Sequence, residues 1–379
     1  MKKSIIVAMD SFKGCIKSLD AGMAVREGIR QAGLDSDVIV LPMADGGEGT
    51  IEILNHYLGG EFKTCRTHDA LMNEVEARFH MWPDGERAVV ELAEAAGLTL
   101  IDQKHRSAVK ATSFGFGELI NCAIEGGARK IICTLGGSAS NDAGLGAMQA
   151  LGLRISANGR FLTKPVTGSD LPFIDDFDIS HLSPNLSECS FSFLYDADIP
   201  FTGPHGATMM YSAQKGASLA EQKFLEAGMR NIASLLTAHF GIQPDSIPGA
   251  GAAGGTGAAL AAFLKATPMK GIDTILDVAS FDKLLENASL VITGEGKADA
   301  QTLQGKVAQG ILRSASVRNV PVVLLAGAYE DKEILQDRGY ASLIDINEGF
   351  DALIADPCNP EIAKSRIISA IKRYLRLSS

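Results

Sequence analysis

The first fifty residues alternate between strand, helix and strand, and this pattern constrains the fold more than any other feature of the chain. Residues 5–9 form an unbroken apolar run, which is typical of a strand buried on both faces. Apolar residues then recur at helical spacing over 21–32, with Ser18 as the expected N-cap and Gly33 as the stop. A second apolar run at 38–43 completes a βαβ unit, which requires parallel strands.

The same alternation returns near the C-terminus, whereas the middle of the chain is more mixed. Further strands are predicted at 62–66, 75–81, 88–92, 130–135, 190–195, 290–293, 320–326 and 343–346. A chain of 379 residues exceeds the size at which one hydrophobic core stops growing, so we expect two domains. The sequence predicts an α/β protein: a doubly wound parallel sheet domain, residues 1–60 plus 285–379, interrupted by an inserted mixed α/β domain, residues 61–284.

Composition narrows the class of protein. The net charge is -10, which argues against a nucleic acid or an anionic membrane as partner, because both attract clustered Lys and Arg. The longest uncharged stretch, 247–264, is mostly Gly and Ala and too weakly apolar to span a membrane. None of the six cysteines forms a C-x-x-C pair, which predicts free thiols rather than a zinc site or a disulfide framework. We therefore expect a cytoplasmic protein.

Glycine-rich polar segments follow several of the predicted strands. Five of them occur at 10–14, 44–50, 136–144, 196–207 and 293–299. In open α/β sheets, ligands bind outside the carboxyl ends of the strands, so these segments are where we expect the chemistry.

Two of these segments suggest a role in binding an anion. Backbone N–H groups in 136–144, at the start of a helical stretch, would form a phosphate cradle, although Ser140, Asn141 or Asp142 would equally serve as helix cap. Lys13 follows the first strand. Its side chain would neutralise a phosphoryl group or bind a substrate carboxylate. The alternative interpretation is a lysine at the surface whose charge is solvated and has no functional role.

Two aspartates stand at predicted strand ends, each beside a glycine-rich turn. Phosphoryl transfer to an alcohol requires one carboxylate near the hydroxyl and another at Mg²⁺, and Asp45 and Asp196 fit these requirements. The pattern leaves open which is which, and turn-forming Asp-Gly is the alternative for both.

The sequence fails the tests for two familiar nucleotide-binding motifs. Neither Gly296-Lys297 nor Gly305-Lys306 precedes Ser or Thr, so the sequence contains no Walker A loop. Residues 249–254 satisfy G-x-G-x-x-G, but 245–248 does not read as the strand that a dinucleotide fold would place before it. We interpret 251–260 as a glycine-rich loop that opens a helix and serves either close backbone approach to a nucleotide or simply tight packing.

Taken together, these segments resemble the signature blocks of the bacterial glycerate kinase family, of glycerate 2-kinase type. The matching blocks occur in family order over residues 4–330 and are 10–14, 44–50, 136–142, 214–217, 251–257, 293–296, 299–302 and 305–306. The resemblance implies a flavodoxin-like domain with an inserted α/β domain and an active site between them. It also implies ATP and Mg²⁺ as co-substrates, transfer to D-glycerate to give 2-phosphoglycerate, no macromolecular partner, and a monomer or homodimer.

The resemblance also implies roles for individual residues. The catalytic set would be Asp45, Asp196 and Lys13, with Asp196 also at the metal. Ser11, Asn141 and Lys215 would bind the substrate. The nucleotide would contact Gly136, Gly137, Ser138, Gly254, Gly255, Thr256, Gly257 and Glu295.

The chain departs from the family pattern at a few positions. Ile199 stands where an amide is usual, and its side chain cannot hydrogen-bond a ligand. Lys297-Ala298 replaces the usual Arg and apolar residue. Alternatives are therefore a kinase that gives 3-phosphoglycerate or acts on a related hydroxy acid, an NAD-dependent oxidoreductase, and a ligand sensor without turnover.

Overall fold

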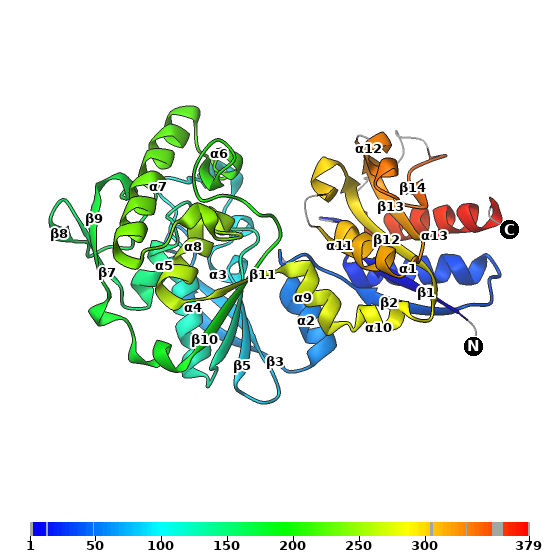
Figure 1. Cartoon of the computed structure of the whole chain (residues 1–379), viewed down its shortest axis with the longest axis horizontal. Coiled ribbons are helices and arrows are strands. Elements are labelled where there is room, and N and C mark those ends of the chain that lie inside the picture. The colour runs from blue at the N-terminus through cyan, green and yellow to red at the C-terminus, as the bar shows by residue number, and fades with distance from the viewer. Residues whose placement is uncertain are drawn as a thin grey trace. The chain divides into compact units, whose positions relative to one another are not determined.

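The chain divides into two compact units. The computed structural model describes residues 3–12, 14–47, 49–303, 306–330, 332–350 and 359–377. Unit 1 comprises Met1–Asp45 and Gly271–Ser379, and unit 2 comprises Gly46–Lys270 (Figure 1). Both boundaries lie earlier than predicted from the sequence. Helix α2 (Thr50–Leu58) packs on the sheet of unit 2, and α9 (Gly271–Val278) packs against a helix of unit 1.

Unit 1 is built on five parallel strands, which are blue and orange in Figure 1. They are β1 (Ser4–Met9), β2 (Asp37–Pro42), β12 (Ala288–Ala298), β13 (Val322–Tyr329) and β14 (Ser342–Asp345). Their order is β14-β13-β12-β1-β2, and every neighbouring pair is parallel. Counted within the unit, this is the 2-1-3-4-5 order of flavodoxin-like folds, whose switch point lies between β1 and β12. The predicted fold class is confirmed.

Helices cover both faces of this sheet. They are α1 (Ser18–Gln31), α9, α10 (Phe281–Leu285), α11 (Val307–Val317), α12 (Lys332–Asp337) and α13 (Pro360–Leu377). Helices α1 and α13 pack on each other and on β1 through a common apolar cluster that includes Val7, Val25 and Ile367. Helix α13 is capped by Asn359, whose side chain accepts from the Glu361 backbone N–H at 3.0 Å.

Ser18 differs from its predicted role as N-cap. It is the first residue of α1, and its hydroxyl donates to the Met9 carbonyl and accepts from the Met43 N–H, both at 2.7 Å. The side chain therefore ties the ends of β1 and β2 together instead of capping the helix. This bridge fixes the strand ends from which Asp10 and Asp45 emerge.

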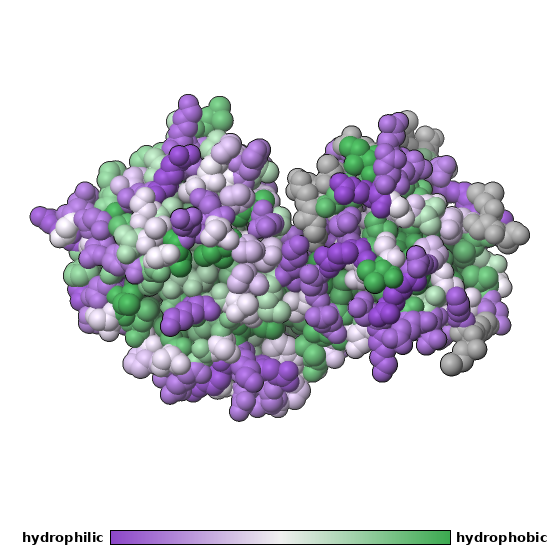
Figure 2. Space-filling view, viewed as in Figure 1, coloured by the Kyte–Doolittle hydropathy of each residue, from purple (hydrophilic) through white to green (hydrophobic). Residues whose placement is uncertain are grey.

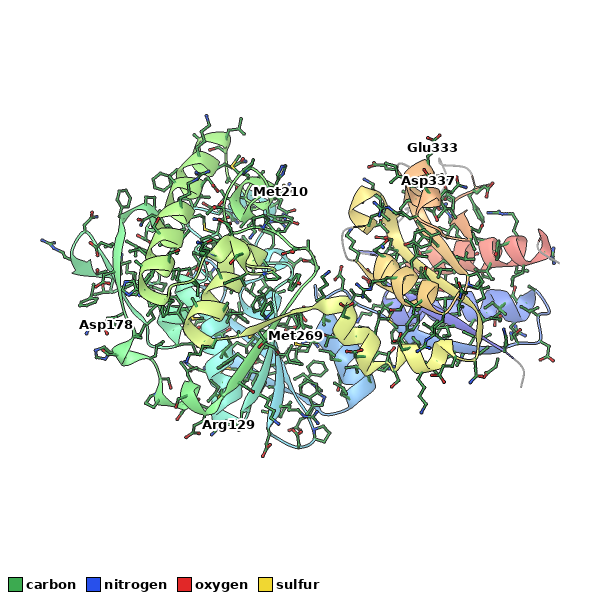
Figure 3. The ribbon with its side chains drawn as sticks, viewed as in Figure 1. Arg129, Asp178, Met210, Met269, Glu333 and Asp337 are labelled. Carbon is green, nitrogen blue, oxygen red and sulfur yellow. A yellow bond between two sulfur atoms is a disulfide. The ribbon has the colours of Figure 1, made fainter. Side chains whose placement is uncertain are left out.

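Unit 2 contains a mixed six-stranded sheet. Its strands are β3 (Glu61–His68), β4 (Glu74–Met81), β5 (Arg87–Glu91), β6 (Lys130–Thr134), β10 (Ser190–Tyr195) and β11 (Thr267–Lys270). The order is β11-β10-β6-β5-β4-β3. The strands β11, β10, β6 and β5 pair in parallel, whereas β4 pairs antiparallel with both β5 and β3. Met269, labelled in Figure 3, lies on edge strand β11. A small second sheet has the order β8 (Arg160–Phe161), β7 (Arg154–Ala157), β9 (Ile174–Asp178).

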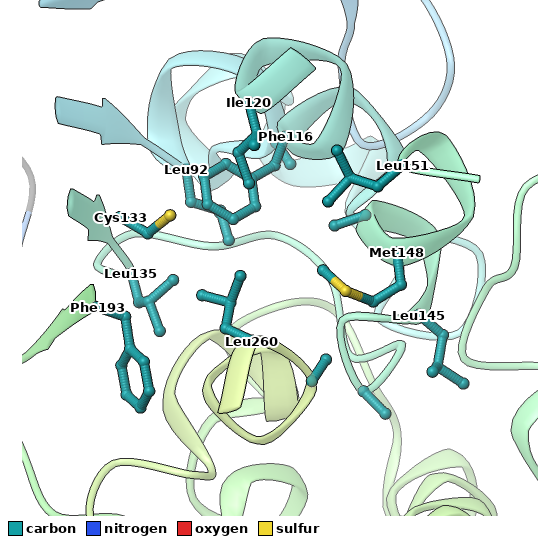
Figure 4. Packing of buried hydrophobic residues seen from close by; sticks show 14 of the residues in the cluster. Leu92, Phe116, Ile120, Cys133, Leu135, Leu145, Met148, Leu151, Phe193 and Leu260 are labelled. Carbon is teal, nitrogen blue, oxygen red and sulfur yellow. The ribbon is translucent and has the colours of Figure 1, made fainter. Parts of the chain in front are cut away.

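The core of unit 2 lies between this sheet and the helices that follow its strands. These helices are α2, α3 (Ala93–Ala96), α4 (Phe114–Glu125), α5 (Leu145–Ala150), α6 (Ala207–Tyr211), α7 (Leu219–Phe240) and α8 (Ala252–Leu264). Figure 4 shows Phe116, Met148, Phe193 and Leu260 packed in one buried cluster. The long helix α7 begins with a capping box at Ser218 and Glu221, which the sequence interpretation overlooked.

One expectation about the cysteines is wrong. Cys65 on β3 and Cys122 on α4 are joined by a disulfide, with a Cα–Cα distance of 6.4 Å, whereas free thiols were predicted. Their separation by 57 residues concealed the pair, because pairing depends on how β3 and α4 pack. Within the described part of the chain, no helix is long and apolar enough to cross a membrane. On the face in Figure 2, hydrophilic residues predominate and apolar ones are scattered over each unit.

Candidate functional site

Unit 1 contains a cavity of about 520 Å³ at the switch point of its sheet. It is lined by residues at the carboxyl ends of β1, β2, β12, β13 and β14 and by residues of α13. Its ionisable side chains are Asp10, Asp45, Glu295, Lys297, Asp299, Lys306 and Arg366. The cavity therefore carries both carboxylates and cations.

Three of the predicted site residues line this cavity. Ser11 and Asp45 lie at the ends of β1 and β2, and Glu295 lies on β12. Asp45 is only 5% exposed. Lys13, the fourth predicted residue of this region, lies outside the described residues. Glu295 was predicted alongside the nucleotide-binding glycines, yet the structure places it in the same cavity as Asp45.

The cations of the cavity are held by neighbouring groups. Lys306, before α11, has its Nζ 4.0 Å from Glu295 Oε2. Arg366 on α13 donates to Asn347 Oδ1 at 2.5 Å. The side chain of Lys297 pairs with Glu330 at 2.8 Å and is half exposed. Lys306 and Arg366 are therefore the cations best placed to receive a substrate carboxylate.

In unit 2, polar residues follow adjacent parallel strands of the larger sheet. Segment 136–140 follows β6, and Asp196 follows β10, which pairs with β6 up to Leu194 and Thr134. Gly137 is exposed and has a φ of +71°, which a residue with a side chain rarely adopts. Asp196 is partly exposed, and its Oδ1 accepts from the Ala197 N–H at 2.8 Å. The carboxyl ends of these strands are a second polar site.

Lys215 is the most unusual group in this second site. Its side chain is 3% exposed, and its Nζ donates to Ser138 Oγ and to the Ser140 carbonyl, both at 2.7 Å. Burial lowers the pKa of Lys215 to about 8, while the negative charge of Asp142 opposes this. A buried ammonium that donates to neutral oxygens favours the approach of an anion. Lys215 thus holds the 138–140 segment and supplies positive charge to it.

The residues beside Lys215 divide into structural and potentially ligand-binding groups. Asp142 is fully buried and accepts from Ser113 N and Oγ, both at 2.7 Å, so it organises the start of α4. Asn141 donates to Thr208 Oγ1 at 3.2 Å. Among the described residues, Ser140 Oγ and Asn141 Oδ1 are buried without a hydrogen-bond partner. Asn141 was predicted to bind substrate, and the structure places it in unit 2 with its side-chain oxygen lacking a donor.

The glycines at the start of α8 pack tightly against a neighbouring segment, which is one of the two uses expected for them from the sequence. Residues Ala253, Gly254 and Gly255 have φ of +54°, +67° and +97°, so the chain makes a left-handed turn before the helix proper. A Cβ on Gly254 would lie 2.3 Å from the Ser140 carbonyl oxygen. Thr256 and Gly257 are also buried. The predicted nucleotide-binding residues 254–257 therefore support the 140–144 segment from behind by close backbone contact.

Glu91 is a candidate site residue that sequence reasoning missed. It ends β5, is 2% exposed, and accepts from the Gly49 and Ile51 N–H groups at 3.0 and 3.3 Å, at the start of α2. Burial is the main cause that raises its pKa to about 8; the two backbone bonds oppose this. The sequence signal that could have identified Glu91 is that it is the single acid in the predicted strand 88–92, which is otherwise apolar. Glu91 anchors the chain just after Asp45.

Comparisons with known proteins place the chain in a family. Residues 5–368 match the glycerate kinase family. A glycerate kinase of Halalkalibacterium halodurans is 37% identical over 86% of this chain and 85% of its own length. A glycerate 2-kinase of Escherichia coli is 37% identical over 86% of each chain.

A solved structure extends the similarity to three dimensions. The crystal structure of a Salmonella typhimurium LT2 protein described as a glycerate kinase 2 has a TM-score of 0.81 and 33% identity. The match covers 100% of this chain and 97% of that one. The fold and the strand-end sites define an α/β enzyme of the ATP-dependent phosphotransferase class that acts on an alcohol group. Within that class, the chain belongs to the glycerate kinase family.

Proposed function

We propose that this protein transfers the γ-phosphoryl group of ATP to the 2-hydroxyl of D-glycerate, giving 2-phosphoglycerate and ADP. The observation that carries the proposal is the unit 1 cavity, which combines buried carboxylates with the cations Lys306 and Arg366. Glycerate has one carboxylate and two hydroxyls. The cations would bind its carboxylate and the acids would accept from its hydroxyls.

The polar site of unit 2 is suited to the phosphates of ATP. Gly136, Gly137 and Ser138 offer backbone N–H groups free of large side chains, and the buried charge of Lys215 lies behind them. Such preorganised donors would stabilise the charge that develops during phosphoryl transfer. Gly254–Thr256 would maintain this segment in position.

Magnesium would be held mainly by the nucleotide. In the part of the chain that the structure describes, no group of three or more His, Cys, Asp or Glu side chains could hold a metal. Mg²⁺ usually needs only one or two carboxylates in addition to substrate phosphates, and the partly exposed Asp196 carboxylate fits that requirement. When bound, the ion would neutralise charge on the transferred phosphoryl group.

The test is a coupled assay of ADP formation with Mg-ATP and short hydroxy acids. We expect turnover with D-glycerate and much weaker turnover with L-glycerate, lactate and glycolate. Asp45→Asn should lower kcat, and Asp196→Asn should raise the Mg²⁺ concentration that is required. No glycerate-dependent ADP formation would refute the proposed activity. Wild-type behaviour of both variants would refute only these two roles.

A further inference from the structure

Glu295 occupies a distinctive position in the unit 1 cavity. On β12, Gly294 is the last residue paired with β1, opposite Met9, whereas Glu295 pairs only with Ala326 of β13. Glu295 therefore lies at the switch point, where the two neighbouring strands diverge and a ligand can enter. It lines the cavity and is 6% exposed.

The carboxylate of Glu295 is incompletely partnered. It receives a hydrogen bond from Thr302, and its Oε2 faces Lys306 Nζ at 4.0 Å, which is too long for a hydrogen bond. The other oxygen, Oε1, is buried and has no hydrogen-bond partner among the described residues. A buried carboxylate oxygen without a donor is costly, so its retention in a cavity needs an explanation. A hydroxyl group of a bound substrate would supply the missing donor.

We propose that Glu295 is the general base that accepts the proton of the attacking glycerate hydroxyl. This inference rests on the function proposed above and deepens it. In the reaction, the hydroxyl oxygen forms a bond to the γ-phosphorus, and the bond from that phosphorus to the β,γ-bridging oxygen breaks. The bond's electron pair leaves with ADP, and the hydroxyl proton passes to the Glu295 carboxylate, from which solvent removes it.

The surroundings of Glu295 suit it to this role at neutral pH. Burial is the main cause that raises the pKa of Glu295 to about 7, and the negative charges of Asp299 and Asp45 raise it further. A hydrogen bond from Thr302 and the positive charge of Lys306 lower it. The other ionisable groups that line the cavity or interact with Glu295 are Asp10, Cys15, Lys297, Tyr329, Tyr340 and Arg366. A base whose pKa lies near the working pH is both ionised and strong enough to take a proton.

This assignment gives Asp45 a different role from that of base. Its negative charge raises the proton affinity of Glu295, so it acts on the reaction through its neighbour. The two carboxylates come from strands on either side of β1, and the Ser18 bridge between the ends of β1 and β2 fixes one of them. Asp45 would therefore be a positioning residue that acts by raising the pKa of Glu295.

The decisive variant is Glu295→Gln, which keeps the size of the side chain and removes its basicity. We expect kcat with D-glycerate to fall by roughly 10²- to 10⁴-fold, with KM for both substrates within about threefold of the wild type. The wild-type kcat should decline below about pH 7, and this acidic limb should vanish in the variant. Asp299→Asn is the matched control: it should keep the limb and shift it to lower pH, because Asp299 raises the Glu295 pKa.

A second variant guards against misfolding of the first. Thr302→Val removes the hydrogen bond that lowers the Glu295 pKa, so the acidic limb should move to higher pH while circular dichroism stays unchanged. Unchanged kcat and pH profile in Glu295→Gln, or an unmoved limb in Thr302→Val, would overturn the assignment. Both of these outcomes are measured with a wild type that is active. Failure of the proposed function is a different outcome, in which the wild type itself forms no ADP with glycerate.

Discussion

The buried charge of Lys215 makes stability depend on pH in a predictable way. Its pKa is about 8 in the folded protein and its ordinary value is 10.5. Between these pH values the unfolded chain binds a proton that the folded chain has released, so stability increases as pH rises. Below about pH 8 both states are protonated, and the full burial cost, about 3 kcal/mol, is present.

Replacing Lys215 with methionine removes this titration and leaves a side chain of similar length. The stability of the wild type relative to Lys215→Met should therefore increase by about 2 kcal/mol between pH 7 and 9.5. At pH 7 the burial cost opposes the two hydrogen bonds to Ser138 and Ser140. We accordingly expect Lys215→Met to lose far more activity than stability near neutral pH.

Urea unfolding followed by tryptophan fluorescence measures this effect directly. The chain has one tryptophan, Trp82, which is 4% exposed within unit 2 and therefore reports on the unit that contains Lys215. A wild-type-to-variant difference that stays constant from pH 7 to 9.5 would refute the reasoning, because Lys215 would then titrate alike in both states. A variant that is strongly destabilised but fully active would also contradict it.

Three other predictions concern the framework of unit 2. Gly254→Ala should lower the free energy of unfolding in urea by more than about 2 kcal/mol, because its Cβ would meet the Ser140 carbonyl. The control is Gly241→Ala, at φ +68° with open space around it, which should cost about 1 kcal/mol. Equal costs in the two variants would argue against tight packing at Gly254. Asp142→Asn should destabilise by about 2–4 kcal/mol through loss of the Ser113 bonds, and a thermal midpoint like that of the wild type would contradict this. The raised pKa of Glu91 implies that the folded protein keeps a proton which the unfolded chain has lost, so wild-type stability falls as pH rises from about 4.5 to about 8. Glu91→Gln should therefore gain stability relative to the wild type over that range, and a pH-independent difference would exclude the raised pKa.

Local sequence patterns were sufficient to predict most of the elements. Apolar runs located β1, β2, β5 and β6, because a strand buried on both faces must be apolar throughout. The strand order of unit 1 followed from the family resemblance, since no local pattern encodes which strands pair. Ser18 illustrates the limit: its residue type suits a helix cap, yet its contacts at Met9 and Met43 are made across the fold.

The candidate site was predicted in part for the same reason. Strand-end position and residue type pointed to Asp45, because both properties are visible in the sequence, whereas Ser11 and Lys215 were expected from the family resemblance. The base role inferred for Glu295 depends on burial and on nearby charges, which only tertiary packing determines. Glu91 and the Cys65–Cys122 pair were missed because their partners are remote in the chain.

Phosphorus NMR of the wild-type reaction tests the central claim most directly. With Mg-ATP and D-glycerate, we predict that the ATP signals decline while ADP and a single phosphomonoester, 2-phosphoglycerate, appear in equal amounts. A 3-phosphoglycerate signal would contradict the proposed position of transfer, and an unchanged ATP spectrum would contradict the kinase activity itself.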